Sequence, residues 1–471
     1  MTGTIQNTLP PKKTKIFLLY NPKGVVDKDI YLCAKGSNFH TEVAAIDNSV
    51  SPEGHTLEKL DLLNVAVRIA QFKPDLVLTI NGGGLDNDGL FSSFCAALSI
   101  PLVLWYVDEP FLIPEWGIRF IPETTIGCTF DRYYEKRLKG WGMYRVFTLP
   151  LGTNPERLLS GLPADQEKMQ DTPTLSFVGS LEYKKIRYLL KNIARLWRSM
   201  PPNMVSVLEK AIEQYRKMPV ADAEEVIAAC AGAMGVGYRF PDGVVKQMVL
   251  SFLDREASFR QRREIIEGLK PLGISVFGEP FWEKVVGKPF YKGRVDYYSP
   301  EIVRLYRSSR INLNISKYQL KTTVNQRVFD CPLCDGFLIS DYREEISNYF
   351  EIDKSMVVYS DLEDLVKKIT YYLDHEKEAT RIIEEGKGTV LDRHTYGHRL
   401  EEMSNRVNKL REDGSFQRNC EQALKGSMPA SLPAFLAAVR QEISSHHADN
   451  PVSLDMPVLD AIGPIERFIH G

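Results

Sequence analysis

The stretch LVLTINGGGLDNDGLFSSFCAALSIPLVLWYVD, residues 76–108, contains one complete unit of an α/β fold. Two apolar runs, at 76–80 and 102–107, flank a short segment with helical spacing at 91–98. A strand that is apolar on both faces is typical of a parallel sheet covered by helices on both sides. The first run ends in a turn of Asn81 and three glycines. The stretch therefore predicts two parallel strands joined by a crossover helix.

The same alternation of apolar strands and amphipathic helices extends in both directions along the chain. The N-terminal part has further predicted strands at 16–20, 126–130 and 145–149, and helices at 56–72 and 132–139. A second series has predicted strands at 174–178, 274–277, 311–315, 337–339 and 356–359, with helices at 301–308 and 362–373. We therefore predict an α/β chain with two Rossmann-like domains that face each other across a cleft.

Three regions follow from this alternation. An N-terminal Rossmann-like domain is predicted over residues 1–170, a C-terminal one over 171–398, and a final helix with a C-terminal helical tail over 399–471. Residues 183–270 lie between two predicted strands of the second sheet, and they are far longer than one crossover needs. They also contain Pro201 and Pro202, which a central strand excludes. We predict that residues 183–270 form a helical insertion outside the second sheet.

The composition narrows the class of protein. The chain has 471 residues, too many for one ordinary hydrophobic core. Its hydrophobic content of 44% and charged content of 25% are typical of a soluble globular protein. The 59 basic and 61 acidic residues leave a formal net charge of −2. Dedicated nucleic-acid or anionic-membrane binders carry an excess of basic residues, so the whole-chain charge argues against both classes.

Targeting segments are not evident in the sequence. No run approaches the roughly 18 apolar residues that a spanning helix needs, so no transmembrane segment is expected. The opening residues, MTGTIQNTLPPKKTK, lack the apolar centre of a signal peptide. The seven cysteines are an odd, scattered set, and the pair Cys331 and Cys334 has no second pair at zinc-site spacing. We expect reduced thiols that pack inside a cytoplasmic protein.

Several segments, in order along the chain, resemble the CgeB-like (spore maturation) glycosyltransferases. The densest are YYSPEIVRLYRSSRINLNIS (297–316), NQRVFDCPLCDGFLISDYREEISNYFE (325–351), VYSDLEDLVKKITYYLDHE (358–376) and HTYGHRLEEM (394–403). WYVDEP (105–110), LPLGTNPERL (149–158) and SFVGS (176–180) are similar to the family more loosely. The resemblance implies a GT-B arrangement, in which the C-terminal domain holds a nucleotide sugar and the N-terminal domain takes the acceptor.

The segment that begins at Asn325 and Gln326 is the first candidate for nucleotide binding. A helix N-terminus offers free N–H groups to a diphosphate, and Arg327 adds positive charge. Asp330 offers two oxygens to a ribose diol. Related retaining enzymes have two glutamates eight residues apart, and the resemblance places them at Thr322 and Asp330, so the first one is missing and the stereochemical course stays open. Alternatively, Arg327 and Asp330 form a local ion pair on an ordinary helix.

Other candidate contacts to the nucleotide sugar follow predicted strands of the second series. Gly179 and Ser180 end the first of these strands, and Lys185 follows within reach of a phosphate, although adjacent lysines on a helix often form only a solvated face. Gly278 ends the next strand and could contact the edge of the base through its backbone. Tyr298 could stack on the base, or it could pack against the sheet.

The acceptor is expected at the strand ends of the first domain. Asp108 follows the predicted strand 102–107, and a carboxylate there could remove the proton of an acceptor hydroxyl as a general base. Alternatively, Asp108 is a solvated acid in a turn. The loop of Gly82, Gly83 and Gly84 leaves the backbone free to approach a ligand closely.

A metal site is not expected. Asp86 and Asp88 have the D-x-D spacing of some metal-dependent enzymes, but two acids on a short loop more often begin a helix. His394 and His398 lie four residues apart without a glutamate partner of the H-E-x-x-H kind, so they are expected to cap and pack a helix.

These features predict a metal-independent glycosyltransferase without a cofactor. It would move a sugar from a nucleotide-activated donor to an acceptor hydroxyl, on a protein such as flagellin or another surface protein, or on a polysaccharide. Two alternatives stay open: a nucleotide-sugar epimerase of the same architecture, and a non-catalytic scaffold that binds nucleotide sugars. The scaffold is favoured by the missing glutamate at Thr322.

Overall fold

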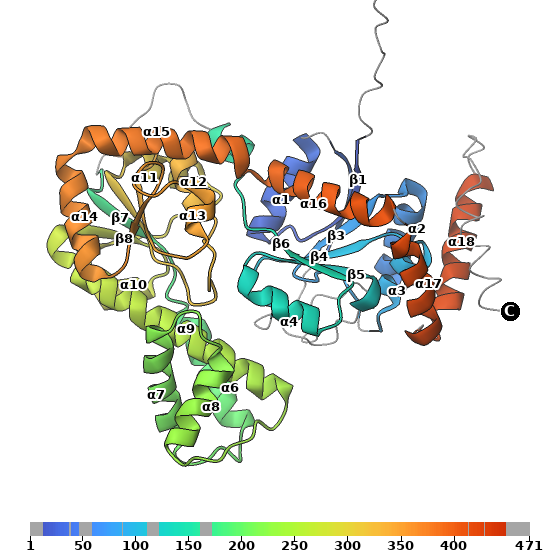
Figure 1. Cartoon of the computed structure of the whole chain (residues 1–471), viewed down its shortest axis with the longest axis horizontal. Coiled ribbons are helices and arrows are strands. Elements are labelled where there is room, and N and C mark those ends of the chain that lie inside the picture. The colour runs from blue at the N-terminus through green and yellow to red at the C-terminus, as the bar shows by residue number, and fades with distance from the viewer. Residues whose placement is uncertain are drawn as a thin grey trace, which may run out of the picture.

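The computed structural model describes residues 13–36, 39–46, 59–86, 88–110, 122–160, 172–412, 414–427 and 429–448. Two six-stranded sheets lie side by side along the long axis of the chain, with helices packed around each of them (Figure 1). Every pair of neighbouring strands in both sheets is parallel. The predicted fold class, two Rossmann-like domains, is therefore confirmed.

The first sheet has the strand order β2-β1-β3-β4-β5-β6. Its strands are β1 (Lys15–Tyr20), β2 (His40–Ala45), β3 (Leu76–Ile80), β4 (Leu102–Tyr106), β5 (Thr125–Thr129) and β6 (Arg145–Thr148). The helices of this part are α1 (Val25–Gly36), α2 (Lys59–Phe72), α3 (Leu90–Ala97), α4 (Glu135–Gly140) and α5 (Pro155–Leu159). The chain reverses its direction of winding between β1 and β3, and ligands bind at such a switch point, beyond the carboxyl ends of the strands.

The second sheet has the strand order β12-β11-β10-β7-β8-β9. Its strands are β7 (Leu175–Val178), β8 (Ile274–Phe277), β9 (Tyr291–Gly293), β10 (Ile311–Asn314), β11 (Leu338–Asp341) and β12 (Val357–Tyr359). Its helices include α10 (Phe281–Val286), α11 (Pro300–Ser308), α12 (Arg327–Leu333), α13 (Ile346–Tyr349), α14 (Leu362–Asp374) and α15 (Glu376–Arg393). The switch point here lies between β7 and β10.

Residues 183–270 form four helices and contribute no strand to the sheet. They are α6 (Tyr183–Leu196), α7 (Met204–Lys217), α8 (Ala223–Ala233) and α9 (Gly243–Gly268), and they project away from both sheets (Figure 1). Trp197, Ile227 and Val249 belong to a separate apolar core inside this helical insertion. The C-terminal part of α9 packs on the second sheet through Ile265 and Ile266, together with Leu269 just after the helix.

The last three described helices return to the first domain. α16 (Tyr396–Glu412) packs against α1 and beneath the first sheet, while α17 (Ser415–Ser427) and α18 (Leu432–Ala448) cover α3 and α2. Four aliphatic side chains of α18 are fully or almost fully buried in the core of the first domain: Leu432, Leu436, Val439 and Ile443. The described part of region 399–471 is therefore a structural part of the N-terminal domain.

The chain crosses between the two domains twice, and the two crossings lie side by side. Thr153 on the first crossing pairs in parallel with Thr395 on the second. The N–H of Thr153 donates to the carbonyl of His394 at 3.0 Å, and the N–H of Tyr396 donates to the carbonyl of Thr153 at 2.9 Å. These backbone hydrogen bonds join the two connecting segments directly.

A chain that ends after residue 413 is expected to lose stability but to keep its affinity for nucleotide. Such a truncation removes α17 and α18 and exposes the apolar surface that Leu432 and Leu436 cover, so the thermal midpoint should fall by several degrees. Nucleoside diphosphate affinity should stay within a few-fold, because the deleted helices pack on the first domain only. Calorimetry and titration measure the two quantities, with a chain ending after residue 448 as the control. A stable truncated protein that no longer binds nucleotide would contradict this prediction.

Candidate active site

The carboxyl ends of the two sheets face each other and are linked by hydrogen bonds. Asp108 follows β4, and it accepts a hydrogen bond from Gln319 Nε2, in the loop after β10, at 3.4 Å. Asp131 follows β5, and it accepts the backbone N–H of Lys321 from the same loop at 2.7 Å. The loops that meet here are those in which parallel α/β sheets place their ligands.

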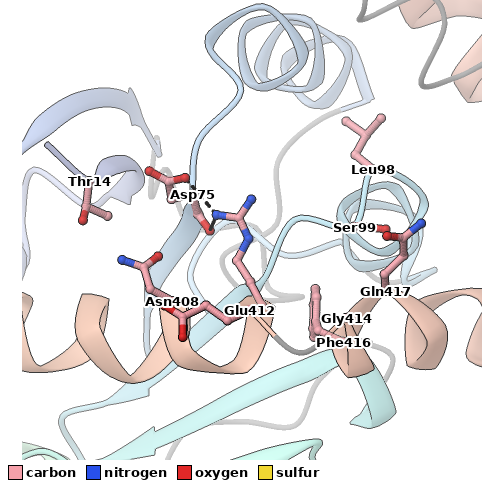
Figure 2. Close-up of a pocket in the computed structure, with 10 residues that line it drawn as sticks. Thr14, Asp75, Leu98, Ser99, Asn408, Glu412, Gly414, Phe416 and Gln417 are labelled. Atoms are coloured by element: carbon pink, nitrogen blue, oxygen red, sulfur yellow. Dashed lines mark hydrogen bonds and ion pairs between the residues drawn. The ribbon is translucent and has the colours of Figure 1, made fainter. Parts of the chain in front are cut away.

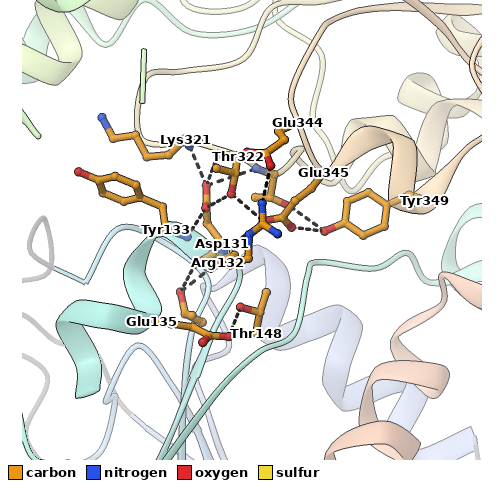
Figure 3. A network of polar contacts seen from close by, with 12 residues as sticks. Asp131, Arg132, Tyr133, Glu135, Thr148, Lys321, Thr322, Glu344, Glu345 and Tyr349 are labelled. Carbon is orange, nitrogen blue, oxygen red and sulfur yellow. Dashed lines mark hydrogen bonds and ion pairs between the residues drawn. The ribbon is translucent and has the colours of Figure 1, made fainter. Parts of the chain in front are cut away.

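Asp131 is the centre of a buried polar network between the domains (Figure 3). Besides the N–H of Lys321, its carboxylate accepts the N–H of Thr322 at 3.0 Å. The Thr322 hydroxyl lies 2.5 Å from Asp131 and 2.6 Å from Glu345, which in turn accepts a hydrogen bond from the Tyr349 hydroxyl at 2.6 Å. Thr322, where the resemblance places a glutamate, is therefore a buried link between the two domains.

A cluster of cations lies beyond the carboxyl ends of β7 and β10. Glu182 accepts hydrogen bonds from Arg255 Nη1 at 2.6 Å and pairs with Lys317 Nζ at 3.1 Å. Burial alone would raise the pKa of Glu182, but Lys317 and Arg255 hold that pKa down at about 2. The carboxylate of Glu182 is thus ionised and paired with both cations.

Two arginines extend this cationic cluster towards α12. Arg262 is buried and donates to the carbonyls of Ser180 at 2.6 Å and Ile315 at 2.7 Å. Burial, together with the charge of Arg327, lowers the pKa of Arg262 to about 10. Arg327 donates through Nη1 to Asn314 Oδ1 at 2.9 Å. Among the described residues, neither Arg262 Nε nor Arg327 Nε has a hydrogen-bond partner. Free donors next to uncompensated positive charge are suited to an anionic ligand.

Asp108 lies at the edge of the cationic cluster. Its side chain is exposed and also accepts a hydrogen bond from Asn81 Nδ2 at 3.1 Å. Partial burial and Arg255 lower the pKa of Lys185, whereas the charge of Asp108 opposes that lowering. Lys185 and Asp108 are therefore within electrostatic range of each other, although they come from different domains.

The turn after β3 fixes the position of Asp108. Asn81 adopts the left-handed conformation with φ of 52°, and its Oδ1 accepts the N–H of Val107 at 2.9 Å. Gly82 and Gly84 follow with φ of 70° and 85°, so the turn requires glycine at these positions. The predicted contact of this loop with an acceptor stays a prediction.

Asp330 and Arg327 point to different surroundings, although they lie three residues apart on α12. Asp330 is fully buried and accepts hydrogen bonds from the hydroxyls of Thr153 and Tyr297. Its charged partner is Arg157, with 3.5 Å between Nη2 and Oδ2. Both carboxylate oxygens thus already have partners within the protein, and the predicted contact with a ribose would have to displace them.

Arg157 lies between Asp330 of the second domain and a second buried carboxylate, Asp29, in its own domain. Its guanidinium donates to Asp29 of α1 through Nε at 2.6 Å and Nη2 at 3.0 Å. Gln326 donates to the same carboxylate at 2.7 Å and accepts from the Tyr396 hydroxyl at 2.9 Å. Gln326, predicted to contact the nucleotide, is buried in this network.

The predicted glycines of the second sheet pack tightly against each other. A Cβ on Gly278 would lie 2.0 Å from the carbonyl oxygen of Gly179, which accepts a hydrogen bond from an indole N–H. The Ser180 hydroxyl donates to Glu279 at 3.2 Å. These three residues lie at the carboxyl ends of β7 and β8, where they were expected, and their contact with a nucleotide stays a prediction.

Asn325 and Tyr298, both predicted to contact the nucleotide, have partners in different domains. Asn325 donates to Asn314 Oδ1 at 2.8 Å, and its own Oδ1 is buried without a partner in the described part of the chain. Tyr298 contacts the first domain instead: its hydroxyl donates to the carbonyl of Val25, and its ring lies 4.7 Å from Lys28 Nζ.

Asp86, His394 and His398, which were considered as metal ligands, have structural partners. Asp86 accepts the N–H groups of Leu90 at 2.9 Å and Phe91 at 2.8 Å, so it caps the start of α3. His394 Nε2 bonds a backbone carbonyl at 3.1 Å, and His398 Nδ1 lies 2.7 Å from a threonine hydroxyl. In the part of the chain that the structure describes, no three metal-binding side chains cluster together.

Sequence reasoning missed most charged residues of these networks, among them Asp29, Asp131, Arg157, Glu182, Arg255, Arg262, Lys317 and Glu345. Arg157 lies in LPLGTNPERL, a segment of the stated resemblance, and it could have been noticed as a cation just after a strand of the first sheet. Asp29, Arg255 and Arg262 lie within helices, and Lys317 directly follows the quoted segment 297–316, so only the tertiary structure brings these charges together.

The raised pKa of Asp330 makes stability depend on pH. Burial raises this pKa from 3.8 to about 6, against the lowering effect of Arg157. Between pH 3.8 and about pH 6, Asp330 is protonated in the folded protein but ionised in the unfolded chain. The free energy of unfolding therefore falls as pH rises through this range. We expect Asp330→Asn to remove this slope. The free energy of unfolding of the variant, minus that of the parent, should therefore increase by about 2–3 kcal/mol between pH 4 and pH 6.5. Guanidinium unfolding at several pH values measures it, with exposed Asp374→Asn as the control; parallel curves for parent and Asp330→Asn would contradict it.

No helix in the described ranges combines the length and the apolarity needed to span a membrane.

Comparison with known proteins gives a family match that lies mainly in the second domain. Residues 258–405 match the family model described as "Glycosyl transferase-like", so about a third of the chain, from α9 to α16, is a glycosyl transferase-like region. No curated protein matches this sequence.

Several solved structures share the two-sheet arrangement. Sucrose-phosphate synthase from Thermosynechococcus elongatus is 12% identical, over 84% of this chain and 99% of that one, with a TM-score of 0.40. A glycosyltransferase from Rickettsia africae is 10% identical, over 85% and 99%, with a TM-score of 0.43. T4 phage β-glucosyltransferase in complex with UDP-glucose is 9% identical, over 87% and 99%, with a TM-score of 0.41. At these values the likeness adds nothing to the architecture already described.

Proposed function

We propose that this protein is a glycosyltransferase that moves a sugar from a nucleotide-activated donor to an acceptor hydroxyl. The observation that carries the proposal is the meeting of a cationic cluster, at the switch point of the second sheet, with Asp108 of the first domain. The glycosyl transferase-like region at residues 258–405 contains three of the cluster's cations, Arg262, Lys317 and Arg327. The cluster suits a diphosphate, and the carboxylate suits proton removal from the acceptor.

The cationic cluster is the proposed site of the donor diphosphate. Arg255 and Lys317 pair with the carboxylate of Glu182, whose charge also acts on Lys185 and Arg262, so the cluster of these four cations and Arg327 has an excess of positive charge over Glu182. The Nε atoms of two of these arginines are buried and lack partners within the described chain, so a phosphate that reached them would satisfy unpaired donors. Fixed cations around the leaving diphosphate would stabilise its charge in the transition state, and on this ground we propose a metal-independent reaction.

The proposed chemistry is a displacement at the anomeric carbon of the donor. Asp108 takes the proton of the acceptor hydroxyl while that oxygen bonds to the anomeric carbon, and the bond between this carbon and the diphosphate oxygen breaks. The hydrogen bond from Asn81 keeps the carboxylate of Asp108 oriented without neutralising it. Domain contacts such as that of Gln319 with Asp108 bring the base next to the donor site.

The narrower proposals rest on the resemblance of the quoted segments. It supports a CgeB-like enzyme of the GT-B type that acts in the cytoplasm on a protein or polysaccharide acceptor. A ribose contact from Asp330 is also proposed on this basis, with Thr153 and Tyr297 releasing the carboxylate when the donor binds.

A non-catalytic scaffold that binds nucleotide sugars is the second candidate. The observation that favours it is Thr322, a buried link between domains where the resemblance places a sugar-contacting glutamate. Release of free nucleotide from donor and acceptor separates the two: a transferase consumes the donor, whereas a scaffold only binds it.

Arg327→Ala is expected to weaken nucleoside diphosphate binding by more than about tenfold, because a charge-assisted hydrogen bond contributes roughly 1.5–3 kcal/mol. The matching nucleoside lacks the phosphates and should bind the variant as it binds the parent. Calorimetric titration with uridine, guanosine and adenosine diphosphates and their nucleosides measures both. Arg304→Ala, which removes an exposed arginine from α11, is the matched control. Equal diphosphate affinity in parent and Arg327→Ala would place the phosphates elsewhere.

A further inference from the structure

Helix α6 presents a strongly basic face. Residues 183–208 contain six basic side chains and no acidic one, in a chain whose total charge is −2. Lys185 belongs to the proposed donor site, and the other five are exposed on α6 or just after it: Lys184, Arg187, Lys191, Arg195 and Arg198. The nearly balanced charge of the whole chain therefore hides a local excess of cations.

The cations of α6 are not neutralised as those of the neighbouring helices are. On α7 and α9, Arg216 pairs with Glu213 and Glu264, and Arg260 pairs with Glu209 at 2.8 Å. Within the described ranges, none of the five cations on the α6 face has a carboxylate at ion-pair distance. Their charge is thus available to a partner outside the chain.

Apolar side chains are also exposed on α6. Tyr188 is 59% exposed, and Leu190 and Leu196 are each 41% exposed. By helical spacing Tyr188 lies among the cations, whereas Leu190 and Leu196 flank the face that Ile186 and Ile193 bury in the helical insertion. Clusters of Lys and Arg on a helix surface are attracted to anionic lipid headgroups, and the exposed apolar side chains beside them can add contacts with a bilayer.

We propose that the α6 face docks on the surface of an anionic lipid bilayer. The cations on the helix run from Lys184 to Arg195, so their row is roughly 16 Å long. A convex helix face can meet a flat anionic surface along its whole length, whereas it offers no groove to a peptide. The insertion that contains α6 projects away from both sheets (Figure 1). This inference is independent of the proposed transfer reaction.

Flotation of the full chain with lipid vesicles tests this proposal. Binding is expected to vesicles of phosphatidylcholine with about a third phosphatidylglycerol, and not to pure phosphatidylcholine, because each cation near an anionic surface adds to the attraction. Affinity should fall at least roughly tenfold between 0.1 and 0.5 M salt. Replacing the five cations by glutamine should lower the affinity by at least about a hundredfold.

A matched variant separates the α6 face from charge in general. Lys354, Lys367, Lys377, Arg381 and Arg393 are exposed on the second domain, and their replacement by glutamine should leave vesicle binding unchanged. Circular dichroism should show that both variants fold like the parent. Equal vesicle binding by the α6 variant and the parent, or no binding by the parent, would overturn the proposal.

A third variant separates a bilayer from an acidic protein. Replacing Tyr188, Leu190 and Leu196 by serine should weaken vesicle binding several-fold and leave binding to soluble polyglutamate unchanged, because only a bilayer accepts apolar side chains. Binding of the parent to polyglutamate without binding to vesicles would overturn the membrane assignment and identify an acidic macromolecule as the partner.

A pocket of about 570 Å³ lies at the amino ends of the first sheet, between the sheet and helices α16 and α17 (Figure 2). Its central charged groups already pair with each other, since Arg411 Nη1 lies 2.8 Å from Asp75 Oδ1.

Discussion

Replacing Asp108 by asparagine is expected to lower the rate of sugar transfer by about a hundredfold or more. The change keeps the size of the side chain and its hydrogen bond to Asn81, but it removes the group that would accept the proton of the acceptor. Affinity for nucleoside diphosphate should stay unchanged, because the proposed phosphate contacts come from the second domain. Turnover measured as nucleotide release, beside calorimetric titration, separates the two effects.

The matched control for Asp108→Asn is Glu344→Gln. Glu344 is also an exposed acid at the facing strand ends, but it pairs with Arg132 at 2.7 Å and lies in the domain contact around Asp131 (Figure 3). Its replacement should change turnover by less than about twofold, since exposed ion pairs contribute little. Unchanged turnover in Asp108→Asn would return Asp108 to the role of a solvated acid in a turn.

Arg157→Met is expected to lower the free energy of unfolding by about 3–5 kcal/mol. Arg157 is the cation between two fully buried carboxylates, Asp29 and Asp330. Methionine fills much of the same volume but leaves both acids without their charged partner. Guanidinium unfolding of parent and variant measures the loss.

Neutralising the two acids should restore much of this stability. The triple variant Arg157→Met, Asp29→Asn, Asp330→Asn has no buried charge left at this position, so it should recover more than half of the loss. Arg145→Met, at an exposed arginine of β6, is the control and should cost less than about 1 kcal/mol. A loss for Arg157→Met as small as that of the control would show that the network contributes little.

The sequence predicted the inner strands and one edge strand of each sheet, β6 and β12, and it missed the other edge strand of each, β2 and β9. Central strands such as β3 and β4 are buried along their whole length and read as uninterrupted apolar runs. The edge strands β2 and β9 are half-exposed, with sequences HTEVAA and YKG, so they lack that signal. Their pairing is decided by the neighbouring strand and not by their own composition.

The candidate site was predictable only where a motif ends a strand. Asp108, Ser180 and Gly278 follow buried runs, so the parallel topology alone places them at the facing ends. Arg327 and Asp330 are neighbours on one short helix, yet one contacts the strand ends and the other contacts the first domain. That division depends on Arg157 and Thr153, which approach from a distant part of the chain, and no local spacing encodes it.

Because α16 to α18 return to the first domain, the order of synthesis on the ribosome affects how the two domains fold. Strands β1 to β6 and helices α1 to α4 emerge first, but α16 to α18, which complete the cover of this domain, follow about 250 residues later. The second domain is continuous in sequence and lies wholly within that interval, so it can complete its core while part of the first domain's apolar surface is still exposed. Synthesis therefore reverses the usual order, in which N-terminal domains fold first. During this delay the first sheet depends on other means, such as chaperones, to keep its apolar surface from improper association.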